Sequence, residues 1–268
     1  MICCAAAVLL VLLVSSCAAS LCANDCANVT SHVVCFNASA PCGSGKPGQF
    51  AFFAFSQISL PAYCDALTRN YDVTARDASR RCPPGTPVSP VLSIHGLWPN
   101  YVGGFPQCCT VGVPLSNTSI ARSFDPRSDP RLFGQLTTFW IDPASADPPV
   151  EVCGQMWNHE HLKHATCMLR PRDPVWFLNM TLALNAFLQP HTAAVERVRA
   201  KHVGALIGAS ELRSLYGRAI QLSCDPSTTT PRLVELRTCW SVSPTTGEPS
   251  AQIDCTPDRF ECPDHFFM

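Results

Sequence analysis

The chain has 268 residues, 47% of them hydrophobic, and a formal net charge of −1, so one or two domains with a sizeable core are possible. This charge balance excludes a strongly basic protein that follows nucleic-acid phosphates over many turns. A local site for a few nucleotides remains compatible with it.

The first twenty residues, MICCAAAVLLVLLVSSCAAS, contain an apolar run that ends in small side chains. Such a run is short for a membrane span and is typical of a secretory signal peptide. We therefore expect residues 1–20 to be a signal peptide cleaved near Ser20, with an uncleaved anchor as the alternative. The mature protein is then expected to be secreted, or vacuolar or lysosomal, without stable membrane association.

Cysteine usage agrees with export. Of the 17 cysteines, three lie in the signal segment and the other 14 make an even number, which in an exported chain predicts disulfides. Residues 21–48 are cysteine-rich and are expected to form a disulfide-held extension. Four sequons predict N-glycosylation: Asn28, Asn37, Asn117 and Asn179.

The first elements of the main domain are strands. QFAFFAFSQISL (49–60) is rich in aromatic and β-branched residues and predicts a buried strand. A proline-rich loop (80–90) follows. VLSIHGLW (91–98) predicts a second strand that ends at Pro99, and residues 130–140 predict a short helix.

Helices dominate the next segment. Residues 156–169 and 173–188 predict helices, the second with Asp173 as N-cap and Pro174 at its first position. Residues 210–220 predict another helix, with Ser210 as cap. Strands are predicted at 219–224 and 232–240. We see no linker between two cores, so the pattern indicates one α+β domain.

The segment HEHLKHATC, which begins at His159, carries unusual chemistry. A zinc-protease motif would need histidine where Lys163 stands, and a protonated lysine would oppose a metal ion. On a helix four side chains share one face about 140° wide, whereas His161 points elsewhere: His159, Glu160, Lys163 and His164. Such a face suits acid–base chemistry, although a histidine-rich helix taken alone is more often only a solvated polar face.

Another histidine lies in a separate segment, SIHGLWPN (93–100). His95 stands at the end of the predicted strand, Gly96 permits close backbone approach, and Trp98 offers a flat stacking surface. Core packing is the alternative for this segment. Taken together, two histidines on separate elements can serve as acid and base, with a lysine near a developing oxyanion and an indole under a base. This pattern suits phosphodiester cleavage without a metal.

The two segments SIHGLWPN and WNHEHLKHATC resemble the two signature segments of the ribonuclease T2 family, the secreted acid ribonucleases. The resemblance extends from about residue 50 to the C-terminus. It implies a single catalytic domain at 49–268, α+β, with a central antiparallel β-sheet packed with helices and stabilised by disulfides.

The resemblance also implies roles for individual residues. His164 would be the general base on the ribose 2′-hydroxyl and His95 the general acid on the 5′-oxygen. Glu160 and Lys163 would stabilise the phosphorane. The expected substrate-binding residues are His159 for phosphate, Trp98 for base stacking, and Asn100, where some members carry an aspartate that reads adenine.

The resemblance further implies four disulfides, which pair Cys82 with Cys153, Cys108 or Cys109 with Cys167, Cys224 with Cys262, and Cys239 with Cys255. Three positions depart from the family pattern: Met156, His161 and Ala165. The five polar positions of the family's catalytic site are all intact, so an active enzyme is expected: His95, His159, Glu160, Lys163 and His164.

Three hypotheses follow. The first is a secreted, monomeric endoribonuclease that cleaves single-stranded RNA but not DNA, through a 2′,3′-cyclic phosphate, without metal or cofactor. The second is an inactive secreted binding protein with the same fold, suggested by the departures and the N-terminal extension. The third is a metal-dependent hydrolase that uses His159, His161 and His164.

Overall fold

The computed structural model describes residues 26, 29–36, 42–67, 82, 92–109, 128–143, 156–171, 173–225, 229–256 and 261–268. The signal peptide, most of the proline-rich loop, Cys153 and three of the sequon asparagines lie outside the described residues: Asn28, Asn37 and Asn117.

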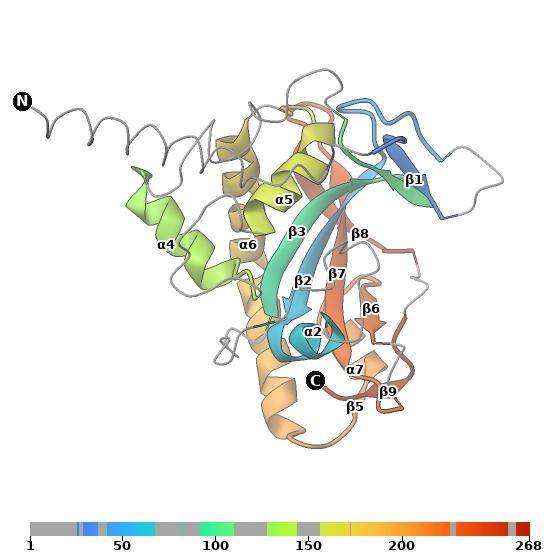
Figure 1. Cartoon of the computed structure of the whole chain (residues 1–268). Helices are drawn as coiled ribbons and strands as arrows, with labels where there is room; N and C mark the ends of the chain where they lie inside the picture. The colour runs from blue at the N-terminus through green and yellow to red at the C-terminus, as the bar shows by residue number, and fades with distance from the viewer. Residues whose placement is uncertain are drawn as a thin grey trace, which may run out of the picture.

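A five-stranded antiparallel sheet forms the centre of the molecule (Figure 1), with strand order β3-β2-β7-β6 and β8 paired to β7. Its strands are β2 (Phe52–Ser59), β3 (Leu92–Asn100), β6 (Gln221–Cys224), β7 (Leu233–Val242) and β8 (Pro249–Ile253). The four predicted strands are confirmed. β3 runs past the predicted end at Pro99, because it is an edge strand and a proline there need not donate to a neighbour.

The described helices are α2 (Leu60–Leu67), α4 (Pro130–Phe139), α5 (Met156–Lys163), α6 (Pro174–Lys201) and α7 (Ala209–Ser214). As predicted, Asp173 caps α6 by accepting from the backbone N–H of Trp176, and Pro174 is its first residue. The helix continues through Pro190, well beyond the predicted end. Ser210 is not the cap of α7. Gly208 caps it, because Ile207–Gly208 forms β5, paired with β9 (His265–Phe266).

The predicted helix at 156–169 is interrupted after Lys163. In a continuous α-helix the Lys163 carbonyl would accept from the Cys167 N–H. Here it accepts from the Cys108 N–H at 2.7 Å, and the Cys167 N–H turns to the His164 carbonyl at 2.9 Å. The chain therefore tightens into a 3₁₀ turn, η4, at Ala165–Cys167.

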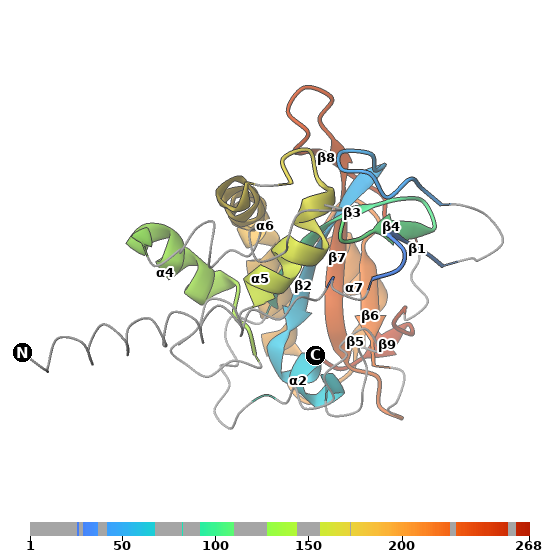
Figure 2. The same ribbon diagram turned by 45° about the horizontal axis from the view of Figure 1, so that its top comes forward.

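The two faces of the sheet differ in character. On β7, alternate side chains point to opposite faces, and Trp240 packs against Phe187 of α6 with ring centroids 5.7 Å apart. This α6 face holds the hydrophobic core, including Phe53 and Leu236. Glu235 lies on the opposite face. The views of Figures 1 and 2 show α5 beside both β3 and α6.

The N-terminal extension joins the domain through a small sheet. β1 (Val33–Cys35) pairs antiparallel with β4 (Gly104–Pro106), directly after β3. The disulfides Cys35–Cys42 and Cys26–Cys108 hold the described part of this extension, as its composition predicted.

Four further disulfides join described cysteines. Cys109–Cys167, Cys224–Cys262 and Cys239–Cys255 agree with the expected pairing. The expected Cys82–Cys153 pair is wrong, because Cys82 is bonded to Cys64 of α2. Among the described helices, none has both the length and the apolar character that a bilayer crossing requires.

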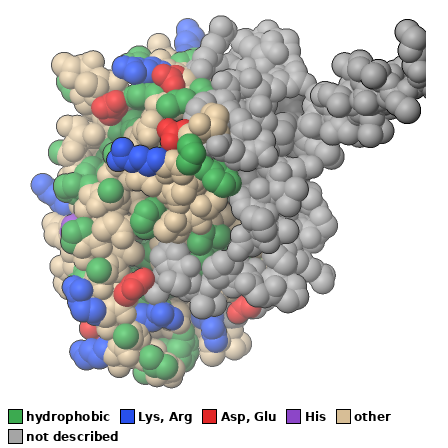
Figure 3. Space-filling model, turned by 90° about the vertical axis from the view of Figure 1, so that its left-hand side faces the viewer, with side chains coloured by type: hydrophobic (Ala, Val, Ile, Leu, Met, Phe, Trp, Pro, Cys, Tyr) green, Lys and Arg blue, Asp and Glu red, His purple; other side chains and the backbone are tan. Residues whose placement is uncertain are grey.

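The described surface in Figure 3 intersperses positive and negative side chains with apolar and uncharged ones. This mixture fits the formal net charge of −1.

Candidate active site

A β-bulge in β3 places His95 and Trp98 on the same face of the sheet. Ser56 of β2 pairs with Gly96 and Gln57 pairs with Ile94, so His95 is the extra residue. In a regular strand, residues three apart would point to opposite faces. Bulges re-aim side chains in this way next to active sites.

Gly96 lies between the two predicted site segments. A Cβ at this position would clash with the Glu160 carboxylate and with the indole nitrogen of Trp98. The missing side chain is therefore what lets α5 approach β3 so closely, as expected from the sequence.

Glu160 is the centre of the cluster, and its side chain is only 1% exposed. Its Oε2 accepts a hydrogen bond from the Trp98 indole N–H. Its Oε1 lies 3.9 Å from His95 Nε2 and 3.9 Å from His159 Nε2. One buried carboxylate thus connects the two segments that stand apart in the sequence.

The ring of Trp98 contacts both proposed catalytic histidines. Its centroid lies 5.1 Å from that of His95 and 5.4 Å from that of His164. The guanidinium carbon of Arg237 lies 5.1 Å from the same ring, within cation–π range. Asn100 donates to the Trp98 carbonyl at 3.0 Å, at the end of β3.

His164 follows directly after α5 and is buried. Burial lowers the pKa of His164 well below its ordinary value, and the positive charges of Lys163, His159 and His95 lower it further. Its Nδ1 has no hydrogen-bond partner among the described residues. A lowered pKa favours the neutral imidazole, which is the form able to accept a proton.

His161 does not join the cluster. Its side chain is 1% exposed and its ring lies 6.0 Å from that of Phe177 on α6. The sequence predicted this, because on a helix His161 points away from the face shared by the other polar side chains of the segment. Ala165 and Met156 are likewise buried in the core, so all three departures from the family pattern pack inward.

Three side chains within the described residues lie close enough to hold a cation: His159, Glu160 and His164, whose ligand atoms are all within 4.8 Å of one another. The metal hypothesis named His161 in place of Glu160. Because the ring of His161 packs against Phe177, that histidine triad does not form.

Glu235 and Arg237 of β7 join the site, although the sequence motifs did not predict them. Glu235 Oε1 lies 2.7 Å from His95 Nδ1 and also accepts a hydrogen bond from the Ser56 hydroxyl. The other carboxylate oxygen, Oε2, pairs with Arg237. The signal was present in RLVELRTCW, where two charged residues occupy alternate positions of a predicted strand. Buried charges are rare unless they are paired.

Glu235 is a stable negative charge. Burial alone would raise its pKa, but the charge of Arg237 and the hydrogen bonds from His95 and Ser56 outweigh burial and lower the pKa to about 2. Tyr63 of α2 completes the surroundings of His95, with ring centroids 5.5 Å apart.

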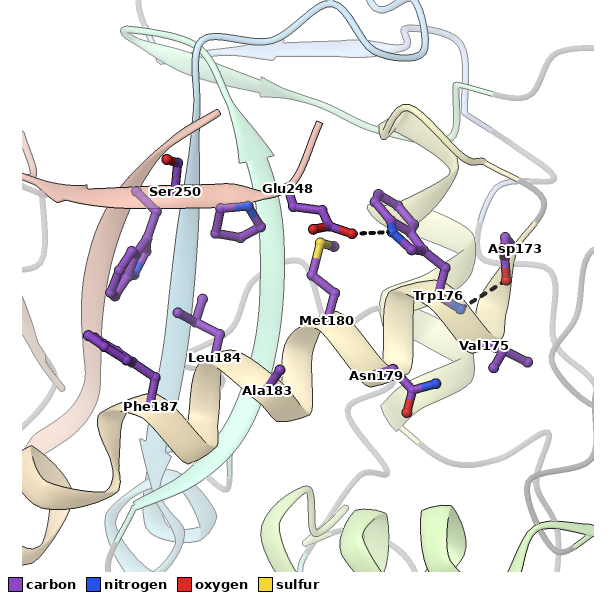
Figure 4. Close-up of a pocket in the computed structure, with 12 residues that line it drawn as sticks. Asp173, Val175, Trp176, Asn179, Met180, Ala183, Leu184, Phe187, Glu248 and Ser250 are labelled. Atoms are coloured by element: carbon purple, nitrogen blue, oxygen red, sulfur yellow. Dashed lines mark hydrogen bonds between the residues drawn. The ribbon is translucent and has the colours of Figure 1, made fainter. Parts of the chain in front are cut away.

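A separate groove lies on the α6 face of the sheet (Figure 4). Trp176, Phe187 and Trp240 are among the side chains that line it. Its two carboxylates are already engaged: Asp173 accepts from the backbone of Trp176, and Glu248 accepts from the indole of Trp176 at 2.8 Å. The acid–base groups of the cluster all lie on the opposite side.

The comparison with known proteins agrees with the sequence resemblance. The sequence model of the ribonuclease T2 family matches residues 50–255. Ribonuclease MC of Momordica charantia is 29% identical over 62% of this chain and 80% of its own length. Ribonuclease DdI of Dictyostelium discoideum is 30% identical over 47% of this chain, and the match spans 44% of that protein.

Solved structures give the same fold. A variant of RNase MC1 in complex with 5′-UMP is 26% identical, has a TM-score of 0.55, and the match covers 82% of this chain and 98% of that one. The S3-RNase of Japanese pear shares the fold at a TM-score of 0.56 and 19% identity, over 81% and 99% of the two chains. The chain therefore belongs to the ribonuclease T2 family, a family of endoribonucleases.

Proposed function

We propose that this chain is a secreted endoribonuclease that cleaves single-stranded RNA by transphosphorylation, without a metal ion. The observation that carries the proposal is the pair of histidines, His95 and His164, in contact with one indole ring, whose N–H donates to the buried carboxylate of Glu160. Family membership supports action on RNA.

In the first step, His164 takes the proton of the ribose 2′-hydroxyl. The 2′-oxygen forms a bond to phosphorus while the bond from phosphorus to the 5′-oxygen breaks. His95 gives its proton to that departing oxygen. The products are a 2′,3′-cyclic phosphate and a free 5′-hydroxyl.

The environment of each histidine supports its role. Burial, together with the positive charges of its neighbours, lowers the pKa of His164 and favours the neutral form that accepts a proton. His95 lies between Glu160 and Glu235, and neighbouring carboxylates favour its protonated form. Pairs of titratable groups in opposed environments are a mark of acid–base assignment.

The remaining groups stabilise charge and bind the substrate. Lys163 and Glu160 interact with the phosphorane, and His159, 27% exposed, contacts phosphate. Trp98 and Asn100 hold a base. Water then opens the cyclic phosphate to a 3′-phosphate, with the two histidines exchanging roles. DNA lacks the 2′-hydroxyl nucleophile and cannot react.

The chain enters the secretory pathway in this proposal and acts as a monomer. The six disulfides among described residues support an oxidising compartment. Asn179 lies exposed on α6, where a glycan would not meet the proposed active site on the other face of the sheet.

Product analysis tests the proposal. The disulfide-intact protein is incubated at about pH 5 with EDTA and a short single-stranded RNA, beside DNA of the same sequence. We expect cleavage of RNA alone, with 2′,3′-cyclic phosphate ends. Activity that appears only after zinc is added would replace this mechanism with a metal-dependent one, and no turnover by folded protein under either condition would favour the binding protein.

A further inference from the structure

We propose that Glu235 is a positioning residue for His95, which holds the imidazole with its Nδ1 proton toward β7 and its Nε2 toward the reacting phosphate. The inference rests on the proposed ribonuclease function, in which His95 is the general acid. It adds a residue from a strand that neither signature segment contains.

The geometry of the sheet brings the two residues together. Glu235 lies 140 positions after His95 in the sequence, yet its Oε1 is 2.7 Å from His95 Nδ1. β2 lies between β3 and β7, and the bulge at His95 turns the ring across β2 toward Glu235. Ser56, on the strand between them, donates to the same carboxylate oxygen.

The hydrogen bond fixes which nitrogen carries the transferable proton. Because an ionised carboxylate only accepts, the hydrogen in this bond belongs to His95 Nδ1. Nε2 then faces the cluster, 3.9 Å from Glu160 Oε1. After Nε2 gives its proton to the leaving oxygen, the neutral ring keeps the proton on Nδ1 and does not need to turn.

The charge of Glu235 is secured by its own neighbours. Arg237 pairs with the oxygen that His95 leaves free, so the carboxylate is held from both sides. Among the described residues, the charged or titratable groups around His95 include Glu235 on β7 with its partner Arg237, Glu160 on α5, Tyr63 on α2, and His164 after α5. The two carboxylates favour the imidazolium, and Glu235 is the one within hydrogen-bond distance.

If Glu235 were present only to pair with Arg237, its removal would be expected to give a different result. Its loss would lower stability, and would change the rate by one factor at every pH. A positioning role instead changes the pH at which the general acid loses its proton, because removing a hydrogen-bonded carboxylate disfavours the imidazolium.

The experiment compares Glu235→Gln with Glu248→Gln. Glu248→Gln is the control. It also removes a carboxylate that accepts a hydrogen bond from a side chain, the Trp176 indole, but on the α6 face of the sheet. We expect the alkaline limb of the pH profile of kcat/KM to move to lower pH by about one unit or more in Glu235→Gln. In Glu248→Gln the limb should stay in place. An unmoved limb in folded, active Glu235→Gln would overturn the inference.

A second measurement on the unmodified protein is independent of turnover and of whether the variant folds. Nitrogen-15 NMR of the imidazoles reports which ring nitrogen carries hydrogen in the neutral form. We expect His95 in the Nδ1–H form, whereas an Nε2–H form would overturn the inference. If the unmodified protein does not cleave RNA, the proposed function fails, and this spectrum still decides whether His95 is in the Nδ1–H tautomer that its hydrogen bond to Glu235 requires.

Discussion

The surroundings of His95 and His164 differ in the charges that act on the two rings. His95 has carboxylates near both ring nitrogens, Glu235 at 2.7 Å and Glu160 at 3.9 Å. His164 is buried beside Lys163 and His159, and its Nδ1 has no hydrogen-bond partner within the described structure. The same residue type is thus prepared in one place to hold a proton and in the other to accept one.

Removing either histidine tests this difference most severely. We expect His164→Ala and His95→Ala each to lower kcat by about 10²- to 10⁴-fold, the usual contribution of a general acid or base. The measurement is RNA cleavage by protein whose fold is verified by circular dichroism. His265→Ala, an exposed histidine on β9, is the matched control. Full activity in both site variants would refute the assigned roles.

Lys163→Met tests how the lysine charge affects both the rate and the pKa of His164. Loss of a charge that stabilises the phosphorane should lower kcat by about 10²-fold or more. Because Lys163 also lowers the pKa of His164, its removal raises that pKa, and the acid limb of the pH profile should move to higher pH. Lys201→Met, whose lysine pairs with Glu211 at 3.8 Å outside the site, should leave the limb unchanged. A limb that moves equally in both variants would contradict this account.

Glu235 should also appear in the pH dependence of stability. Its pKa is about 2 in the folded protein against an ordinary value of 4.5. The stabilisation is therefore complete above about pH 4.5 and is lost as pH falls toward 2, by about 3 kcal/mol. Urea unfolding at several pH values measures it. Glu235→Gln should show its largest deficit against the unmodified protein above pH 4.5, and a constant deficit down to pH 2 would contradict the prediction.

Gly96→Ala tests the close approach of the two segments. A methyl group there would meet the Glu160 carboxylate and the Trp98 indole, so we expect a loss of about 1–3 kcal/mol in unfolding free energy together with a loss of activity. Gly134→Ala on α4 is the control, because a Cβ at Gly134 would meet nothing within 4 Å. If Gly96→Ala were as stable and active as Gly134→Ala, the described contact would be incorrect.

The sequence predicted those parts of the site that are local. His95 with Trp98, and Glu160 with His164, each lie within one short segment, so their spacing can be read from the amino-acid sequence alone. The family resemblance implied that Cys167 pairs with Cys108 or Cys109, and the structure pairs it with Cys109.

Long-range pairing could not be predicted in this way. Glu235 and Ser56 reach His95 only because β2 lies between β3 and β7, and the sequence does not state strand order. The end of α5 at Lys163 depends on a hydrogen bond from Cys108, a residue far away in the chain. The error at Cys82 has the same origin, since its partner Cys64 lies on a helix, α2, that was not predicted.

The adjacent cysteines 108 and 109 have a consequence for the chemistry of the thiols. Cys108 bonds to Cys26 of the extension, whereas Cys109 bonds to Cys167 at the end of the catalytic segment. If Cys26 were lost, Cys108 would be a free thiol next to the Cys109–Cys167 bond, and its ionised form could attack that bond and exchange with it. The disulfide from Cys26 therefore keeps the Cys108 sulfur from exchanging with the neighbouring Cys109–Cys167 bond.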